Sequence, residues 1–146
     1  MRIKIEKPDI YHFSTKMKVR VSDINYGNHM SNDKFLTFAN QVRVEFYAAH
    51  QMHELDLKGT GSIMSDAFVN YLSEGKLNDV LSIYLTVENV HRLGFDLYYR
   101  FKNTTDGRDV AMVKTCMLCY NYEQHKIAKV SDSLKALFDS LKLMSH

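Results

Sequence analysis

The residues best suited to chemistry lie in the polar segment from Asp23 to Asn32, which reads Asp-Ile-Asn-Tyr-Gly-Asn-His-Met-Ser-Asn. This segment joins an alternating, strand-like stretch to a long apolar, helix-like one. Such a junction directs side chains and the unpaired N–H groups of a helix start toward one point, where they stabilise developing negative charge. His29 can move a proton near neutral pH, or it can simply hold the turn by bonding to the backbone.

A second polar segment runs from Tyr71 to Leu81 and reads Tyr-Leu-Ser-Glu-Gly-Lys-Leu-Asn-Asp-Val-Leu. Glu74, within it, carries a carboxylate that could serve as a base. The plainer alternative is an exposed carboxylate at a strand end, which describes most glutamates. The sequence leaves both readings open.

The flanking patterns predict the elements that position these residues. Alternation predicts a strand from Thr15 to Val21, and Ser31 or Asn32 can cap a helix that runs to about Met52. The apolar positions of that helix, at helical spacing, are Phe35, Phe38, Ala39, Val42, Phe46 and Ala49, with Leu36, Tyr47 and Ala48 beside them. A helix with so wide an apolar stripe is expected to be central and covered by protein.

The second half of the chain favours strands. The predicted strands are Ser62–Tyr71, Ile83–Val87, Phe95–Phe101 and Val110–Tyr122, and a turn at Asn103–Gly107 joins the last two. A short helix is expected from Ser131 to Leu143. Hairpin connections imply an antiparallel sheet, so the fold class is α+β, with one helix packed on the sheet.

Length and composition set the bounds. The 146 residues suit a single domain spanning 1–146, and 45% apolar with 25% charged residues is typical of soluble globular proteins. A net charge of +2 gives no ground for nucleic-acid binding, and no apolar run is long enough to span a membrane. The N-terminal residues do not resemble a secretory signal, so a cytoplasmic location is expected.

Cys116 and Cys119 form an isolated Cys-x-x-Cys within a predicted strand. Residues three apart on a strand point to opposite faces, and no second ligand pair lies nearby. We therefore expect reduced, mostly packed thiols and no metal site.

Both polar segments resemble the signature of the hotdog-fold thioesterases, including the 4-hydroxybenzoyl-CoA and acyl-ACP thioesterase-like branches. The family pattern Asp-x-Asp-x-x-x-His-(Val/Met)-Asn-Asn-x-x-(Tyr/Phe)-(Leu/Ile) matches from Asp23 to Leu36, and Tyr-x-x-Glu-x-x-x-x-Asp-x-Leu matches from Tyr71. One position departs from it: Asn25 stands where the family usually carries its catalytic aspartate. The resemblance implies a hotdog fold, in which a curved antiparallel sheet wraps a long central helix, here followed by a short C-terminal helix. It also implies a homodimer or homotetramer with sites at the subunit interface.

The resemblance further implies an enzyme that hydrolyses acyl-CoA or acyl-carrier-protein thioesters. It needs no cofactor, because coenzyme A or phosphopantetheine arrives with the substrate, and acyl carrier protein is a potential partner. In this reading the Asn32 N–H polarises the carbonyl, and Asn25 positions water or substrate. Glu74 with His29 does the proton work, and Asp23 and Glu45 are alternate carboxylates.

The resemblance also suggests substrate contacts. Tyr47, Phe68 and Tyr71 are expected to line the acyl pocket, and His91 and Arg92 to contact nucleotide phosphate. The rival interpretation is a catalytically weak or inactive hotdog domain that binds an acyl thioester or related ligand, since an amide cannot replace a carboxylate as base or nucleophile. A hydratase of the same fold ranks last, because its differently spaced Asp and His are not found.

Overall fold

The computed structural model describes residues 2–144. Its elements in chain order are β1 (Phe13–Lys18), a 3-10 turn η1 (Val21–Asp23), α1 (Asn32–Ala49), β2 (Gly61–Tyr71), β3 (Val80–His91), β4 (Gly94–Asn103), β5 (Asp109–Asn121), β6 (Lys126–Ile127) and α2 (Asp132–Leu143).

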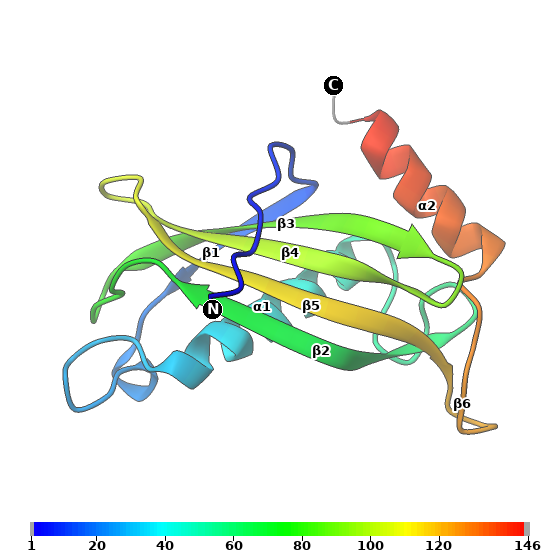
Figure 1. Cartoon of the computed structure of the whole chain (residues 1–146), viewed down its shortest axis with the longest axis horizontal. Coiled ribbons are helices and arrows are strands. Elements are labelled where there is room, and N and C mark those ends of the chain that lie inside the picture. The colour runs from blue at the N-terminus through cyan, green and yellow to red at the C-terminus, as the bar shows by residue number, and fades with distance from the viewer. Residues whose placement is uncertain (1, 145–146) are drawn as a thin grey trace.

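All strand pairs are antiparallel, and the sheet has the order β1-β3-β4-β5-β2, with the short β6 paired to β5. The long helix α1 lies against one face of the curved sheet, and the N-terminal segment crosses the opposite face (Figure 1). This arrangement is the predicted α+β hotdog fold.

The register fixes which residues share an end of the sheet. At one end, Tyr71 of β2 pairs with Ala111, which pairs with Phe101 and then Ile83. At the other end, where β2 begins at Gly61, Ile63 pairs with Leu118, which pairs with Gly94 in the β3–β4 hairpin. We call these the Tyr71 end and the Gly61 end.

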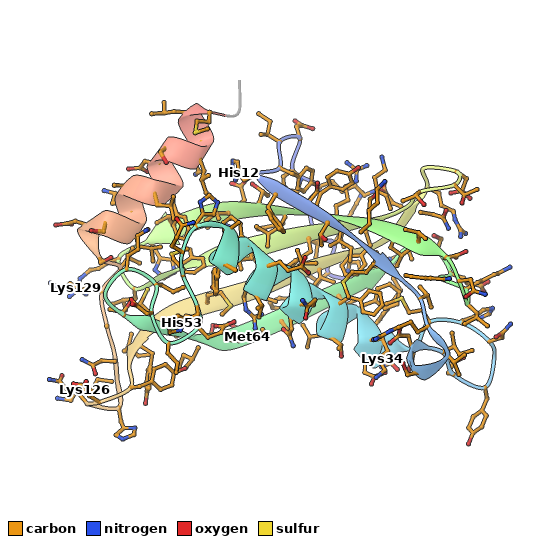
Figure 2. The ribbon with its side chains drawn as sticks, turned by 180° about the vertical axis from the view of Figure 1, so that it is seen from behind. His12, Lys34, His53, Met64, Lys126 and Lys129 are labelled. Carbon is orange, nitrogen blue, oxygen red and sulfur yellow. The ribbon has the colours of Figure 1, made fainter. Side chains whose placement is uncertain are left out.

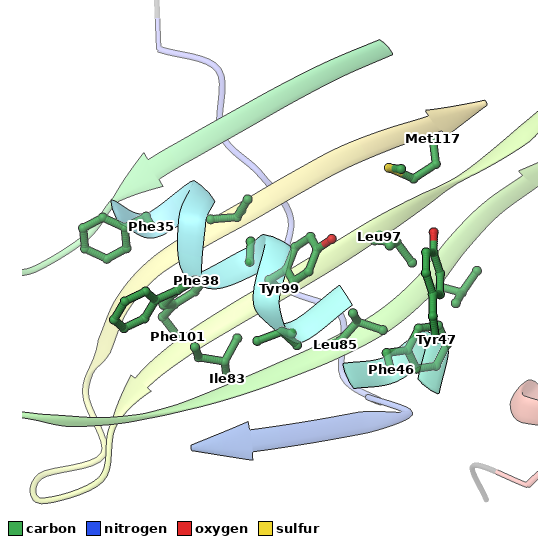
Figure 3. Close-up of a cluster of buried hydrophobic side chains, with 14 of the residues drawn as sticks. Phe35, Phe38, Phe46, Tyr47, Ile83, Leu85, Leu97, Tyr99, Phe101 and Met117 are labelled. Carbon is green, nitrogen blue, oxygen red and sulfur yellow. The ribbon is translucent and has the colours of Figure 1, made fainter. Parts of the chain in front are cut away.

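The core lies between α1 and the sheet (Figure 3). The helix contributes the predicted stripe, and the sheet contributes alternate residues of its strands; the buried members include Phe35, Phe38, Val42, Phe46, Tyr47, Ile83, Leu85, Leu97, Tyr99 and Phe101. Burying one side chain of this size contributes roughly 1.5–3 kcal/mol, so this packing holds α1 firmly against the sheet.

Two predicted boundaries differ from the structure. The first strand ends at Lys18, because the chain enters the turn η1, and Val21 is therefore 75% exposed instead of sharing a strand face with Met17. The central helix ends at Ala49, where His50 leaves helical geometry, and Ala49 itself is exposed. The remaining predicted elements are confirmed; β3 and β4 extend beyond their predicted ends, and the short β6 was not predicted.

Cys116 and Cys119 are both free thiols on β5, and Cys119 is buried. Burial raises the pKa of Cys119, and burial together with Asp96 raises the pKa of Cys116 to about 11. Within residues 2–144, no helix has the length and apolar character needed to cross a membrane.

Candidate active site

The polar junction forms a tight turn. Ile24 and Met30 form an antiparallel bridge, and the Asn25 N–H donates to the His29 carbonyl at 2.9 Å. Asn28 occupies the left-handed region with φ 64°, which asparagine tolerates better than most residues. The turn is therefore closed by contacts among its own residues.

The side chain of Asn25 holds this turn. Its Oδ1 accepts from the Gly27 N–H at 2.9 Å and the His29 N–H at 3.4 Å, a pattern that asparagine and aspartate both favour. The Asn25 amide NH2 has no acceptor among the described residues. Its oxygen is thus committed to the turn, and its two N–H donors remain available to a substrate or water.

The turn pairs with the second polar segment. The Met30 N–H donates to the Gly75 carbonyl at 2.7 Å, and His29 forms a bridge with Lys76. These backbone contacts bring His29 Nε2 to 3.2 Å from Glu74 Oε2. The two side chains are 41% and 58% exposed, so substrate and water can reach them.

A carboxylate beside Nε2 favours the tautomer that carries its proton there, and Nδ1 is then the proton acceptor. Gly27 lies next to this nitrogen: a Cβ at Gly27 would be 3.8 Å from His29 Nδ1 and 3.3 Å from Asn25 Oδ1. The glycine thus keeps space beside the acceptor nitrogen.

The start of α1 follows directly. Ser31 occupies the N-cap position, but its hydroxyl donates to Asp33 Oδ1 at 2.6 Å and caps no backbone N–H, and this bond lowers the pKa of Asp33. The Asn32 N–H donates to no acceptor within the described chain. The Asn32 carbonyl accepts from the Tyr71 hydroxyl at 3.0 Å, and the Tyr71 ring packs edge-on against Phe35. The helix start is therefore fixed in place while its first donor stays free.

The two alternate carboxylates lie elsewhere. Asp23 is 1% exposed and accepts from the backbone N–H and Nε of Arg20, so it stabilises η1 and faces no substrate. Glu45 accepts from Thr15 and Gln41, and it lies roughly 20 Å along α1 from Asn32 at about 1.5 Å per residue. Figure 2, turned by 180° from Figure 1, shows α1 in front of the sheet, with Lys34 near its start and His53 beyond its end.

The three predicted acyl-pocket residues are only partly brought together. Tyr71 packs at the start of α1, whereas Tyr47 is fully buried further along the helix, and burial raises its pKa well above the usual value. Phe68 faces the opposite side of the sheet, where Lys114 Nζ lies 5.8 Å from its ring centre. On a strand, residues three apart face opposite ways, so Phe68 and Tyr71 cannot line one pocket within a chain.

His91 and Arg92 lie in the β3–β4 hairpin, at the Gly61 end. Glu74 precedes the other end of β3, and the 12 residues of this strand extend roughly 35 Å at about 3.3 Å each. Within one chain, His91 and Arg92 therefore lie far from the His29–Glu74 pair.

Sequence reasoning missed Arg108. Its Nη2 donates to the Glu74 carbonyl at 3.0 Å, and its Nε lies 3.3 Å from Asp106. The arginine anchors the backbone of Glu74 to the β4–β5 hairpin, a contact between segments distant in the sequence that no local pattern signals. Among residues 2–144, no cluster of His, Cys, Asp or Glu has an arrangement that could hold a metal ion.

Comparison with known proteins places this site in context. Solved structures share the fold: a 1,4-dihydroxy-2-naphthoyl-CoA thioesterase from Synechocystis (14% identity, TM-score 0.79, 89% of this chain and 97% of that one) and a Staphylococcus aureus protein in complex with CoA (19%, 0.79, 93% and 87%). A thioesterase superfamily protein from Jannaschia is also similar (16%, 0.80, 92% and 85%). A search of curated protein sequences gives no significant match.

A family model described as the thioesterase-like superfamily matches residues 19–138, which include the turn, α1, strands β2 to β6 and most of α2. Both polar segments lie inside this range. The chain belongs to the thioesterase-like superfamily.

Proposed function

We propose that this protein hydrolyses acyl thioesters of coenzyme A or of an acyl carrier protein to a free acid and a thiol. The observation that carries the proposal is the His29–Glu74 pair, with 3.2 Å between Nε2 and Oε2, beside the uncapped start of α1. Family membership and the similarity to a CoA-bound structure support it.

The geometry suits a general-base mechanism. His29 Nδ1 takes a proton from water as the water oxygen attacks the carbonyl carbon, and Glu74 stabilises the imidazolium that forms. The Asn32 N–H, at the positive end of α1, stabilises the tetrahedral oxyanion. When the C–S bond breaks, the imidazolium returns its proton to the sulfur, and acid and thiol leave.

Asn25 has a supporting role in this mechanism. Its oxygen shapes the turn, and its free N–H donors orient the water or the thioester. The step that an aspartate would perform in related enzymes is assigned to His29 and Glu74.

We infer that the working form is a homo-oligomer built on a dimer. β2 lies at a sheet edge and has a free side, and an edge strand of 11 residues offers unpaired backbone groups to a second copy. Two-fold pairing of β2 is antiparallel, so it sets the Tyr71 end of one protomer beside the Gly61 end of the other. A homotetramer would be two such dimers.

This pairing gives the predicted phosphate contacts a role. His91 and Arg92 lie at the Gly61 end, so those of one subunit come near the His29–Glu74 pair of the other. There they would bind the phosphates of CoA or phosphopantetheine while the Tyr71 side receives the acyl group.

A panel of acyl-CoA and acyl-phosphopantetheine-carrier thioesters, from acetyl to palmitoyl and with aryl members, tests the reaction. Free thiol is measured by its reaction with a chromogenic disulfide. Release well above the uncatalysed rate for at least one member is expected, and absence of release across the whole panel would overturn the proposal.

The rival function is a module that binds an acyl thioester without hydrolysing it, and Asn25 is the observation that favours it. It predicts saturable binding of a thioester that stays intact over hours. Calorimetric titration followed by chromatography of the bound ligand separates it from the enzyme.

A further inference from the structure

The N-terminal segment lies as a strap across the sheet face that α1 does not cover (Figure 1). Asn70 clamps this strap: its Oδ1 accepts from the Ile5 N–H at 2.6 Å, and its Nδ2 donates to the Ile3 carbonyl at 2.8 Å. Lys7 Nζ adds an ion pair to Asp109 at 2.7 Å. The strap is therefore a built part of this face.

A cavity of about 480 Å³ opens beside the strap, over β2 and β5. Its apolar part consists of Ile5, Leu72 and Met112, of which Ile5 and Met112 are nearly fully buried. The volume lies within the range of roughly 300–1,000 Å³ usual for small-molecule pockets.

The same cavity has a cationic rim of Arg2, Lys4 and Lys7, and no acidic side chain is among the described residues that line it. Lys4 forms no ion pair within the described chain, and Arg2 donates to a neutral acceptor, the Tyr71 carbonyl, at 3.3 Å. Lys7 shares the single carboxylate of Asp109 with Arg100, which binds it at 2.8 and 3.0 Å. The rim thus retains net positive charge above an apolar floor.

The cavity is distinct from the candidate active site. Asn70 and Leu72 point to the strap side of the sheet, and Tyr71 between them points to α1, where it contacts Asn32 and Phe35. The sheet therefore lies between the cavity and the uncapped start of α1.

We propose that this cavity binds an anionic amphiphile, namely a medium-chain carboxylate, with its head on the Arg2–Lys4–Lys7 rim and its chain on Ile5, Leu72 and Met112. The choice of a carboxylate rests on the proposed function, because thioester hydrolysis releases such an acid. The positive rim favours an anionic head, and the apolar floor favours a hydrocarbon chain.

The test is a titration with decanoate, below its micelle-forming concentration, of protein carrying ¹³C-methyl methionine. The Met112 methyl signal should shift saturably with one dissociation constant. Lys4→Glu, at an exposed position, should weaken binding by about tenfold or more, because it reverses the charge at the rim. The matched control Lys135→Glu, at an exposed position of α2 that does not line the cavity, should bind as the wild type does.

Two further ligands complete the design. Decanol, which lacks the charge, should bind at least about tenfold more weakly than decanoate. The proposal is overturned if the Met112 signal does not shift, or if Lys4→Glu binds decanoate as tightly as the wild type does. It is also overturned if the protein binds decyl phosphate and does not bind decanoate. Binding is read without turnover, and Glu74→Gln should retain it, so failure of hydrolysis and failure of this site are distinguishable.

Discussion

At the scale of single residues, Asn25 holds the turn and, in the proposed mechanism, also orients the water or the thioester. Its oxygen accepts two backbone N–H groups of the turn, and a carboxylate at the same position would accept the same bonds. The substitution for the family's aspartate therefore preserves the turn, removes the negative charge and adds two N–H donors. The proposed mechanism assigns the proton transfer to His29 and Glu74, which the contacts between the turn and the second polar segment bring together.

Asn25→Asp tests this division of labour. Since the proposed mechanism assigns the base to His29 and Glu74, the variant should hydrolyse thioesters within about threefold of the wild-type rate. Adding a missing general base would instead typically gain roughly 10²–10⁴-fold. Steady-state kinetics on the best panel substrate measures it. A gain of that larger size would show that the wild-type site lacks its base.

The residue scale also shows what the sequence can and cannot reveal. The family resemblance of the two motifs suggested that Glu74 acts with His29, and the structure has their side chains 3.2 Å apart. Strand alternation places Phe68 and Tyr71 on opposite faces of the sheet, so one chain does not bring both of them to one acyl pocket. The commitment of the Asn25 oxygen depends on the closed turn, and the Arg108–Glu74 contact depends on tertiary structure; neither could be read from local pattern.

At the scale of elements, periodicity predicted the helices and the strands because both are governed by burial of one face. The errors lie at ends: β1 stops at Lys18 because the Asp23 carboxylate accepts the Arg20 N–H and closes η1, and α1 stops at Ala49. Side-chain bonds of this kind decide boundaries without leaving a periodic signal.

The β4–β5 hairpin and the strap meet at Asp109, and they give a pH-dependent prediction. Arg100, and then Lys7, lower the pKa of Asp109 from 3.8 to about 2. The depressed folded-state pKa means that the ionised carboxylate stabilises the fold fully above about pH 4, and that this contribution is lost as the pH falls toward about 2.

Asp109→Asn should therefore lower the free energy of unfolding by about 1–2 kcal/mol at neutral pH and by much less near pH 2. Urea unfolding at both pH values measures the difference, with Glu123→Gln in an exposed turn as the matched control. An equal loss of unfolding free energy at the two pH values would contradict the stabilising role of the ionised Asp109 carboxylate.

At the scale of the whole molecule, one chain holds the proton-transfer pair and the basic hairpin at opposite ends of the sheet. The resemblance suggested both groups from sequence, but their distance of roughly 35 Å along β3 follows only from the register and the strand length. The proposed antiparallel pairing of two β2 edges would bring the two groups together across subunits, so the proposed mechanism depends on the dimer.

Two complementary variants test this arrangement. The Glu74→Gln homodimer lacks the His29–Glu74 pair in both sites. The Arg92→Glu homodimer has the phosphate contact reversed in both sites, so each homodimer is defective. In co-refolded mixtures, heterodimers contain one intact site, and activity at low substrate should recover to roughly a quarter of wild type. Light scattering should give at least twice the 17.0 kDa chain mass, and a mixture as inactive as its parents would contradict sites shared between subunits.

The central claim is that His29 and Glu74 together perform the proton transfer of thioester hydrolysis. Its most direct test is the pH–rate profile of wild type, His29→Ala and Glu74→Gln on one acyl-CoA. We predict that kcat falls by about 10²–10⁴-fold in each variant with little change in KM, and that His29→Ala loses the limb of the profile that reports the imidazole. Full activity in both variants, with the wild-type pH profile intact, would contradict the account.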